Sequence, residues 1–541
     1  DSESSQLSYA QQRHRFLWRL DPQSTAYHLG GALRLLGRLD IEALQASFQG
    51  LITRHESLRT VFQMDEAGLP QQKIDAQGKF ELNWIDLSDM PIAQSRWRAH
   101  AEAKRINAML FDLTQGPLLR VALIRVAAEE HHLVVVMHHI ISDAWSNRII
   151  IDEFAARYRA QVERLEFSLP PLAIQYADYA LWQRNWLEAG EKERQLTYWR
   201  NQLGETHPVL QLPTDHPRAS IANYRAARHD FVLPVALATG LQRRAQHLGT
   251  TLFTVLLAGF QALLYRYTGQ SDMRVGVPIA NRHRVEIENI VGLFVNTQVL
   301  CSRIDSRMPL SELLEQTREA ALGAQTYQDL PFEQLVEALQ PERSLHQNPL
   351  FQVMFNHLRE DYRALGQLPG LTVEEYELGE RSAQFELTLD SVERPDGRID
   401  ARFTYADELF EADTIKRLSE HYLRVLERLA ETPERCLGDI TLLSAAEWQQ
   451  LIEWGVNERR YANTEPVHRL IERQVNDRPD ATALIFGETE LSYAQLNSRA
   501  NRLAHQLIGL GVKPESRVGI AVERSIEMVV GLLATLKAGG A

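Results

Sequence analysis

The sequence predicts an α/β protein built from more than one domain. At 541 residues the chain is longer than a single hydrophobic core usually supports, and this length favours three or four domain-sized units. Five consecutive apolar residues, Leu133-Val-Val-Val-Met137, predict a strand that is buried on both faces. After a polar stretch, apolar residues recur at the spacing of one helical face, at Ile151, Phe154, Ala155 and Tyr158. The central unit is therefore a strand, a polar loop and a helix.

The composition and the charge restrict the class of protein. The chain is 44% apolar and 24% charged, which is the balance of a soluble globular protein. The formal net charge of −13 disfavours nucleic acid as the main partner, and no basic run suggests a membrane surface. The cysteines, Cys301 and Cys436, fit a reducing compartment, and neither has a zinc-ligand neighbour. The first residues lack the features of a signal peptide and an initial Met, so we expect a cytoplasmic fragment of a longer polypeptide.

Several further elements can be predicted in chain order. A helix is expected from about Ile41, and a solvated cap is one interpretation of the charged residues at its end, 54–56. The segment 117–126 alternates as a strand does and should pair with the 133–137 strand as a hairpin. The run from Thr250 to Leu264 predicts a buried core helix, with Thr250 or Thr251 near its N-cap and Gly269 just past its end. This helix is too short to span a bilayer.

The polar stretch after the central strand carries the candidate chemistry. It reads His138-His139-Ile-Ile-Ser-Asp143-Ala144. Neighbouring strand residues point to opposite faces, so only one histidine can face a given cavity, which argues against a metal site that uses both. A histidine after an apolar strand is most often structural. Asp143 could hold an imidazole in place or pair with a distant arginine. In this spacing the stretch resembles the His-His-x-x-x-Asp-Gly motif of nonribosomal peptide synthetase condensation domains and their acyltransferase relatives.

The resemblance extends over the first 352 residues. Further signatures of the family appear in the family's order at 8–18, 54–62, 176–182, 292–297, 328–333 and 348–352. Tyr179 stands where the family has Phe, Arg343-Ser-Leu345 stands where it usually has Arg-Asp, and Ala144 stands where it has Gly. Ordered matches of this number make a chance resemblance implausible.

The resemblance implies a fold and a domain order. It implies two chloramphenicol-acetyltransferase-like lobes in a V arrangement, which we assign to residues 1–175 and 176–441, with the histidine loop at their junction. A linker is expected at 442–466. The stretches 491–497 and 536–541 resemble the first two signatures of an adenylation domain, so 467–541 is the incomplete start of one. The phosphate-binding loop and the catalytic lysine of that family lie beyond residue 541, and the chain should not adenylate a substrate.

The resemblance also implies a reaction and the residues that serve it. The amine of an acceptor aminoacyl group attacks the thioester carbonyl of a donor, and both are carried on phosphopantetheine arms of carrier proteins. His138, His139 and Asp143 form the catalytic motif, in which His139 is the reacting imidazole and His138 is structural. Asp143 is expected to be structural and to pair with Arg282 of the second lobe, as the family pattern implies, and the alternative is that it orients His139. A role of His139 as general base and a role as positioning group both remain open.

Two further positions are expected to support the site. Asn296 lies in the 292–297 signature and is expected to contribute to the active-site surroundings. Glycine at position 144 would permit a positive φ or a close approach to the phosphopantetheine arm. If the loop needs a positive φ there, Ala144 costs about 1 kcal/mol or more and shifts His139. If the backbone is helical at that point, the substitution costs little.

Several other functions compete with peptide-bond formation. An epimerisation domain shares the histidine motif, but the 292–297 phrase is of the condensation type. Heterocyclisation would need Asp at the first histidine, and the fused adenylation start argues against a free acyltransferase that uses coenzyme A. A catalytically silent docking platform is favoured only by Ala144. The expected partners are an upstream donor carrier protein, a downstream acceptor carrier protein and the adenylation domain, with a monomeric chain that binds no cofactor or metal itself. Three phrases near the N-terminus, at 7–12, 16–18 and 24–28, resemble the subclass of the family that accepts a D-configured donor residue.

Overall fold

A computed structural model describes most of the chain, in the ranges 4–218, 224–340, 348–358, 364–378, 381–460 and 464–541. The departure at Arg343-Ser-Leu345 lies outside these ranges. The chain divides into two compact units, Asp1–Leu443 and Ser444–Ala541, and each has a hydrophobic core of its own.

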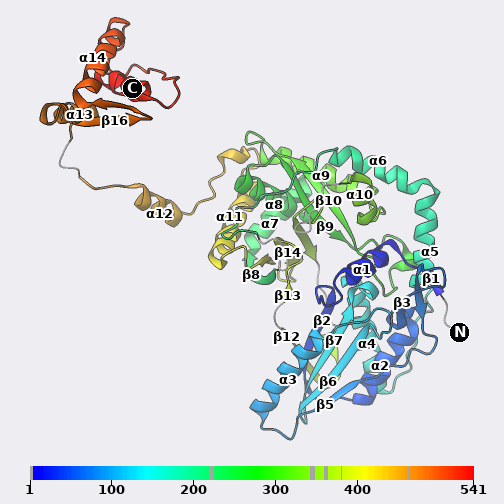
Figure 1. The fold of residues 1–541 in the computed structure, drawn as a ribbon. Coiled ribbons are helices and arrows are strands. Elements are labelled where there is room, and N and C mark those ends of the chain that lie inside the picture. Colours follow the sequence, from blue (N-terminus) through cyan, green and yellow to red (C-terminus); the bar gives the residue numbers. More distant parts are fainter. Residues whose placement is uncertain (1–3, 219–223, 341–347, 359–363, 379–380, 461–463) are drawn as a thin grey trace. The chain divides into compact units, whose positions relative to one another are not determined.

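The first sheet of the first unit contains the central strand. Its five strands are ordered β12-β2-β7-β6-β5, with bounds Leu371–Tyr376, His28–Gly37, Glu130–His138, Leu119–Ala127 and Asn83–Asp86. The hairpin of β6 and β7 confirms the pairing expected from sequence. Figure 1 shows the sheet flanked by α3 (Ile92–Ala108) and by the pair α2 (Ile41–Arg54) and α4 (Ala144–Glu163). Because the sheet is covered by helices, nearly every residue of β7 is buried.

One strand of this sheet comes from far along the chain. β12 lies in the segment assigned to the second lobe, but it pairs antiparallel with β2, from Leu371 opposite Gly37 to Tyr376 opposite Ala32. β2 would otherwise present an unpaired edge, and an unpaired edge leaves backbone N–H and C=O groups without partners. The two lobes are therefore tied by backbone hydrogen bonds as well as by side chains.

The second sheet of the first unit is larger. Its seven strands are ordered β10-β9-β11-β14-β15-β8-β13, with bounds Asn296–Arg303, Asp272–Ile279, Val353–Leu358, Leu387–Glu393, Ile399–Ala406, Arg225–Leu233 and Arg381–Ser382. Its core includes α8 (Leu252–Thr268), which packs with α7 (Val235–His247), α9 (Leu310–Thr326) and α11 (Ala412–Glu431). Thr251 caps the start of α8 and Gly269 ends it in the left-handed conformation, as predicted.

Within the described ranges, no single helix combines the length and the apolarity needed to cross a bilayer. Taken together, the consecutive helices α7 and α8 have the length and the composition of a membrane span, but they are bent by 107° at the break between them. The second of them, α8, is the buried core helix predicted from sequence.

The remaining elements of the first unit complete the two lobes. β1, β4 and β3 form a small antiparallel sheet, with bounds Ser4–Gln6, Pro70–Ile74 and Thr60–Met64. The other helices are α1 (Tyr9–Leu20), α5 (Tyr176–Trp186), α6 (Lys192–Leu203) and α10 (Phe332–Leu339).

The end of α2 differs from one of the two expectations for it. His55 is fully buried, and its Nε2 lies 3.0 Å from Glu153 Oε1 on α4. Arg54 Nε donates to the same oxygen at 3.1 Å. A solvated cap is therefore the wrong interpretation for His55, because a carboxylate from a distant helix draws this end of α2 into the core.

The second unit is small and has its own core. It contains α12 (Ala445–Gly455), α13 (Val467–Asp477), the hairpin β16–β17 (Thr482–Phe486 and Thr489–Ser492), α14 (Tyr493–Gly509) and α15 (Ile526–Lys537). The core is formed by apolar residues of β17, α14 and α15, among them Leu491, Leu496, Ile526 and Leu533. Lys537 is nearly buried and pairs with Glu472, so it is a packing residue.

Candidate active site

The histidine loop begins where β7 ends. β7 stops at His138, a short 3-10 turn covers His139–Ile141, and α4 starts at Ala144. Asp143 is the N-cap of α4, because its Oδ1 accepts a hydrogen bond from Ser146 N at 2.8 Å. The strand, the polar loop and the helix predicted from sequence are therefore confirmed, and the loop is only five residues long.

His138 is held as a neutral, buried side chain. It is 3% exposed, and its Nδ1 accepts a hydrogen bond from Ile140 N at 3.1 Å. Burial, with smaller contributions from His28 and His139, lowers the pKa of His138 to about 3. An imidazole that accepts through Nδ1 and resists protonation suits a structural position better than a reacting one.

His139 has a different environment. Its backbone N–H donates to the carbonyl oxygen of Tyr27 at 2.8 Å, which fixes the turn. Its side chain is partly exposed, while its Nδ1 is buried and has no hydrogen-bond partner among the described residues. Of the two motif histidines, His139 is thus the one that is only partly buried.

Asp143 is engaged by four donors. Its Oδ1 accepts from Ser146 N and from Arg282 Nη2 at 3.1 Å, and its Oδ2 accepts from the backbone N–H groups of Phe294 and Val295 at 2.9 and 3.1 Å. The pairing of Asp143 with Arg282 that the sequence predicts is therefore present. None of the hydrogen bonds found for Asp143 in the described structure goes to His139, so the carboxylate ties the loop to the second lobe.

Arg282 is the other half of this tie. Its side chain is 0% exposed, and its Nη1 donates to the carbonyl oxygens of Ile287 and Ile290 at 2.9 and 2.5 Å. The guanidinium also lies 4.1 Å from the centroid of the Phe294 ring. Burial lowers the pKa of Arg282, while Asp143 opposes that shift. The buried charge is thus paired and surrounded by acceptors.

Ser146 is a residue whose role the sequence did not reveal. Its Oγ accepts from Arg282 Nη2 at 2.7 Å and from Gly292 N at 3.0 Å, and donates to Gly292 O at 2.8 Å. The only sequence signal is that Ser146 lies in the first turn of α4. Serines are common in the first turn of helices for local reasons, so this signal alone does not predict a contact with Gly292.

Asn296 has a supporting position beside a cavity. Its Nδ2 donates to the carbonyl oxygens of Gln328 and Leu330 at 3.3 and 2.8 Å, and its Oδ1 accepts from Phe332 N at 3.0 Å. These bonds tie the start of β10 to the segment that enters α10. Asn296 therefore shapes the backbone around it, and its amide is occupied by the protein itself.

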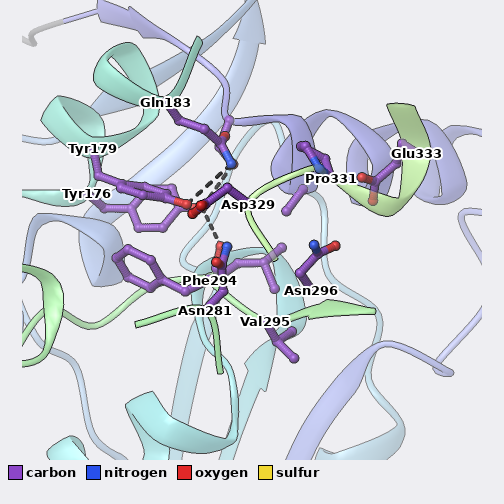
Figure 2. A pocket seen from close by; sticks show the side chains of 13 residues that line it. Tyr176, Tyr179, Gln183, Asn281, Phe294, Val295, Asn296, Asp329, Pro331 and Glu333 are labelled. Carbon is purple, nitrogen blue, oxygen red and sulfur yellow. Dashed lines mark hydrogen bonds between the residues drawn. The ribbon is translucent and has the colours of Figure 1, made fainter. Parts of the chain in front are cut away.

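The cavity beside Asn296 lies between α1, α5, α10 and the start of β10 (Figure 2). It has a volume of about 270 Å³ including space open to solvent. Thirteen residues line it: Ser8, Ala10, Tyr176, Tyr179, Gln183, Asn281, Leu293, Phe294, Val295, Asn296, Asp329, Pro331 and Glu333. Burial raises the pKa of Glu333, which lies 3.5 Å from Arg13 of α1. His138, His139 and Asp143 are not among these lining residues.

Ala144 occupies a helical position. It is the first residue of α4, its side chain is exposed, and it is not among the described non-glycine residues with positive φ. Because the helical region is open to every L-residue, the alanine imposes no backbone strain here. The second of the two expectations for this position therefore applies, in which the substitution costs little.

Comparisons with known proteins show the family of the chain. The family model of the condensation domain matches residues 2–452, and that of the AMP-binding enzyme matches residues 471–541. The chain therefore belongs to the condensation-domain family and continues into the beginning of an AMP-binding domain. The family predicted from sequence, the mixed α/β two-lobed fold and the adenylation start are all confirmed at this level.

Three known proteins show how far this similarity extends. Gramicidin S synthase 2 of Brevibacillus brevis is 37% identical over 536 residues, which are 99% of this chain and 12% of that protein. The X-domain from teicoplanin biosynthesis is 29% identical with a TM-score of 0.72, over 81% of this chain and 97% of the X-domain. A four-domain nonribosomal peptide synthetase bound to AMP and glycine shares the fold, at 21% identity and a TM-score of 0.75, over 100% of this chain and 41% of that one. The chain thus spans only 12% of the length of this synthase relative.

Proposed function

We propose that the first unit forms a peptide bond between two thioester-bound substrates. The acceptor nitrogen bonds to the carbonyl carbon of the donor thioester, and the carbon–sulfur bond breaks. The acceptor begins as an ammonium ion and gives up two protons, of which one ends on the departing thiol and the other leaves to solvent. A thioester is already activated, so the protein has to align the two ends and handle the protons and one developing oxyanion.

The observation that carries the proposal is the contrast between the two motif histidines. His138 is buried, bonded through Nδ1 and held neutral, whereas His139 is partly exposed at the start of the loop. His139 is the imidazole that can accept a proton from the attacking amine or donate a hydrogen bond to the tetrahedral intermediate. We assign His139 to the reacting atoms and His138 to the support of the turn.

The pair of Asp143 and Arg282 supports this arrangement by joining the loop to the other lobe. Their buried pair joins the loop before α4 to the segment before β10, which are far apart in the sequence. A loop held at both lobes keeps His139 in a defined place when substrates approach. This fixed geometry is what an aligned reaction between two tethered groups requires.

The partners follow from the reaction. We propose that the donor and the acceptor arrive on separate carrier proteins, each on a 4'-phosphopantetheine arm, and that an upstream and a downstream carrier serve the chain in turn. The reaction needs no cofactor bound to this chain. We also propose a D-configured residue at the donor end, which the N-terminal phrases favour.

The main alternative is a docking platform without catalysis. Its only support in the sequence is Ala144, and a helical, exposed alanine does not disturb the loop that carries His139. His139, Asp143 and Arg282 are all present, and the pair of Asp143 and Arg282 holds the loop that carries His139. The silent docking platform is therefore one possible outcome of a peptide-forming assay.

The proposal can be tested with defined thioesters. A donor dipeptide with a D- or an L-terminal residue and an acceptor amino acid are loaded onto separate carrier proteins, and intact-protein mass spectrometry follows the product on the acceptor carrier. We expect product with the unaltered chain, and a rate lower by about 10²-fold or more in His139→Ala, as is typical for loss of an acid–base group. His216→Ala is the matched control, because His216 is exposed and pairs with Glu411 away from the loop.

The outcomes separate the candidates. Extended peptide formed by the unaltered chain, with the loss confined to His139→Ala, supports both the reaction and the role of His139. Equal product from His139→Ala would remove His139 from the reaction while leaving condensation in place. No product with any donor, while both carriers still bind, would identify a silent platform.

A further inference from the structure

His14 lies against His139, although the two residues are far apart in the sequence. The centroids of their rings are 5.0 Å apart, and the ring planes are inclined by 33°. His14 belongs to α1, whereas His139 opens the turn after β7. The contact therefore brings a second imidazole to the residue that we assign to the reacting atoms.

The helix that carries His14 is fixed at both ends. Ser8 and Gln11 form a capping box at its start, and Ser8 Oγ lies 2.8 Å from the hydroxyl of Tyr176. Near its end, Trp18 Nε1 donates to the carbonyl oxygen of Phe111 at 3.1 Å. Because α1 is held in this way, the position of the His14 ring is set by the fold.

The surroundings of His14 keep its ring in one place and uncharged. The Tyr27 ring meets it edge-on at 4.9 Å, and the backbone carbonyl of the same tyrosine holds the N–H of His139. The charged or titratable groups that face His14 are Arg13, His138 and His139. Burial is the main reason that the pKa of His14 lies well below its ordinary value, so a neutral ring packs on His139.

Among the described residues, no carboxylate bonds to the ring of His139. Asp143 directs both of its oxygens to Arg282, to Ser146 and to the backbone before β10. The Nδ1 atoms of His14 and His139 are both buried, and neither has a hydrogen-bond partner in the described ranges. In many enzymes an acidic residue orients the catalytic imidazole by a hydrogen bond to this nitrogen. Here the ring of His14 packs against His139 in place of such a partner.

The geometry points to His14 as a positioning residue that holds the ring of His139 in its orientation by packing against it. This inference rests on the proposed function, because it concerns the residue assigned to condensation. In this role His14 does not touch the substrate. It acts by removing orientations of His139 that do not face the reacting groups.

The inference can be tested in the full chain with two substitutions. His14→Ala removes the ring, and His14→Phe keeps a flat ring without nitrogens. We expect His14→Ala to lower kcat by about 10-fold or more, because small misplacements of a catalytic group cost up to about 10²-fold. The KM for the acceptor carrier should change by less than about twofold, since binding is not affected. His14→Phe should retain kcat within about threefold.

A second measurement needs no substrate. Diethyl pyrocarbonate acylates accessible, neutral imidazoles, and peptide mass spectrometry gives its rate of reaction with His139. We expect a rate several-fold higher in His14→Ala, because one face of the His139 ring is uncovered, and an unchanged rate in His14→Phe. If the unaltered chain makes no peptide product, the proposed function fails, whereas the modification rates still decide whether His14 holds His139.

His132→Ala is the matched control. His132 lies at the other end of β7, is 5% exposed, and packs its ring 5.0 Å from that of Tyr376. Its removal should lower stability without changing kcat or the modification rate of His139. An equal loss of kcat in His132→Ala and His14→Ala would overturn the inference, and so would His14→Phe losing as much as His14→Ala. Should His14→Ala fold poorly, His14→Val replaces it with the same expected directions, because valine keeps part of the packing but is smaller than the imidazole and has no flat ring to cover His139.

Discussion

The buried ion pair of Asp143 and Arg282 positions the histidine loop more than it adds to the net stability of the fold. Both side chains are almost fully buried, and bringing two charges out of water is costly. The cost is offset because Asp143 accepts four hydrogen bonds and Arg282 donates to carbonyl oxygens as well as to the carboxylate. The pair therefore fixes the place where the histidine loop meets the second lobe.

Removal of one partner of this pair should be strongly destabilising. We expect Asp143→Ala or Arg282→Ala each to lower the free energy of unfolding by about 3–5 kcal/mol, because an unpaired buried charge is left behind. The double variant should lose clearly less free energy of unfolding than the sum of the losses in the two single variants. Urea unfolding followed by tryptophan fluorescence measures the three values.

An exposed pair provides the comparison. Arg200 and Glu193 lie 2.8 Å apart on the surface of α6, and their double-mutant cycle should give a coupling below about 1 kcal/mol. Additive losses at Asp143 and Arg282 would contradict the tie between the lobes.

Ala144 allows a sharp test of the motif's final position. Since its backbone is helical and its side chain is exposed, Ala144→Gly should leave kcat within about twofold and lower the free energy of unfolding by up to about 1 kcal/mol, as glycine does in helices. The peptide-forming assay and urea unfolding measure the two quantities. A gain in kcat of about tenfold or more would show that the methyl group limits the reaction.

At the level of elements, the segment before β10 must pass very close to α5. A Cβ added at Gly292 would collide with the ring of Tyr176, whose hydroxyl bonds to Ser8 and to the carbonyl oxygen of Leu293. Tyr176 is buried and therefore cannot move aside easily. A glycine is needed at this point because of a tertiary contact.

Gly292→Ala should therefore destabilise the first unit by about 1–3 kcal/mol, the usual cost of overpacking a core. Thermal unfolding and the peptide-forming assay should both report the change, since Gly292 also bonds to Ser146. Gly31→Ala is the control, because Gly31 lies in β2 with no atom within 4 Å of an added Cβ, and it should leave stability unchanged or raise it slightly. Similar losses at both positions would rule out the contact with Tyr176 as the cause.

At the scale of the whole molecule, buried neutral histidines make stability depend on pH. The pKa of His138 is about 3 in the folded protein, and an unfolded histidine titrates near about 6.5. Below about pH 6.5 the unfolded chain takes up a proton at this residue, and the folded chain does not until about pH 3. Stability contributed by His138 is therefore lost as the pH falls through this window.

A variant that cannot be protonated isolates this effect. His138→Asn keeps an acceptor for Ile140 N, and the free energy of unfolding of the unaltered chain should fall more steeply than that of the variant, by up to about 1.4 kcal/mol per pH unit between about pH 6.5 and 3. Urea unfolding at several pH values measures the two slopes. Parallel curves would show that His138 titrates alike in both states.

Local patterns in the sequence predicted the elements that are built locally. The apolar run before His138 predicts a buried strand, and the helical spacing of the apolar residues after Ser146 predicts α4. Thr251 and Gly269 mark the two ends of α8. These features depend on neighbouring residues, so the sequence carries them directly. The ordered signatures also predicted the family, which the family model confirms, and the pairing of Asp143 with Arg282, which is present in the structure.

Only the tertiary structure decided the contacts between distant segments. The burial of His55 against Glu153, the crossing of β12 to β2, the bonds of Asn296 and the packing of His14 on His139 all join residues far apart in the chain. A periodic pattern states which face of an element is apolar, but not which element will cover that face. The sequence by itself thus determined the family and predicted the motif that carries His139, and tertiary packing, such as that of α1 on the turn after β7, decided which side chains surround His139.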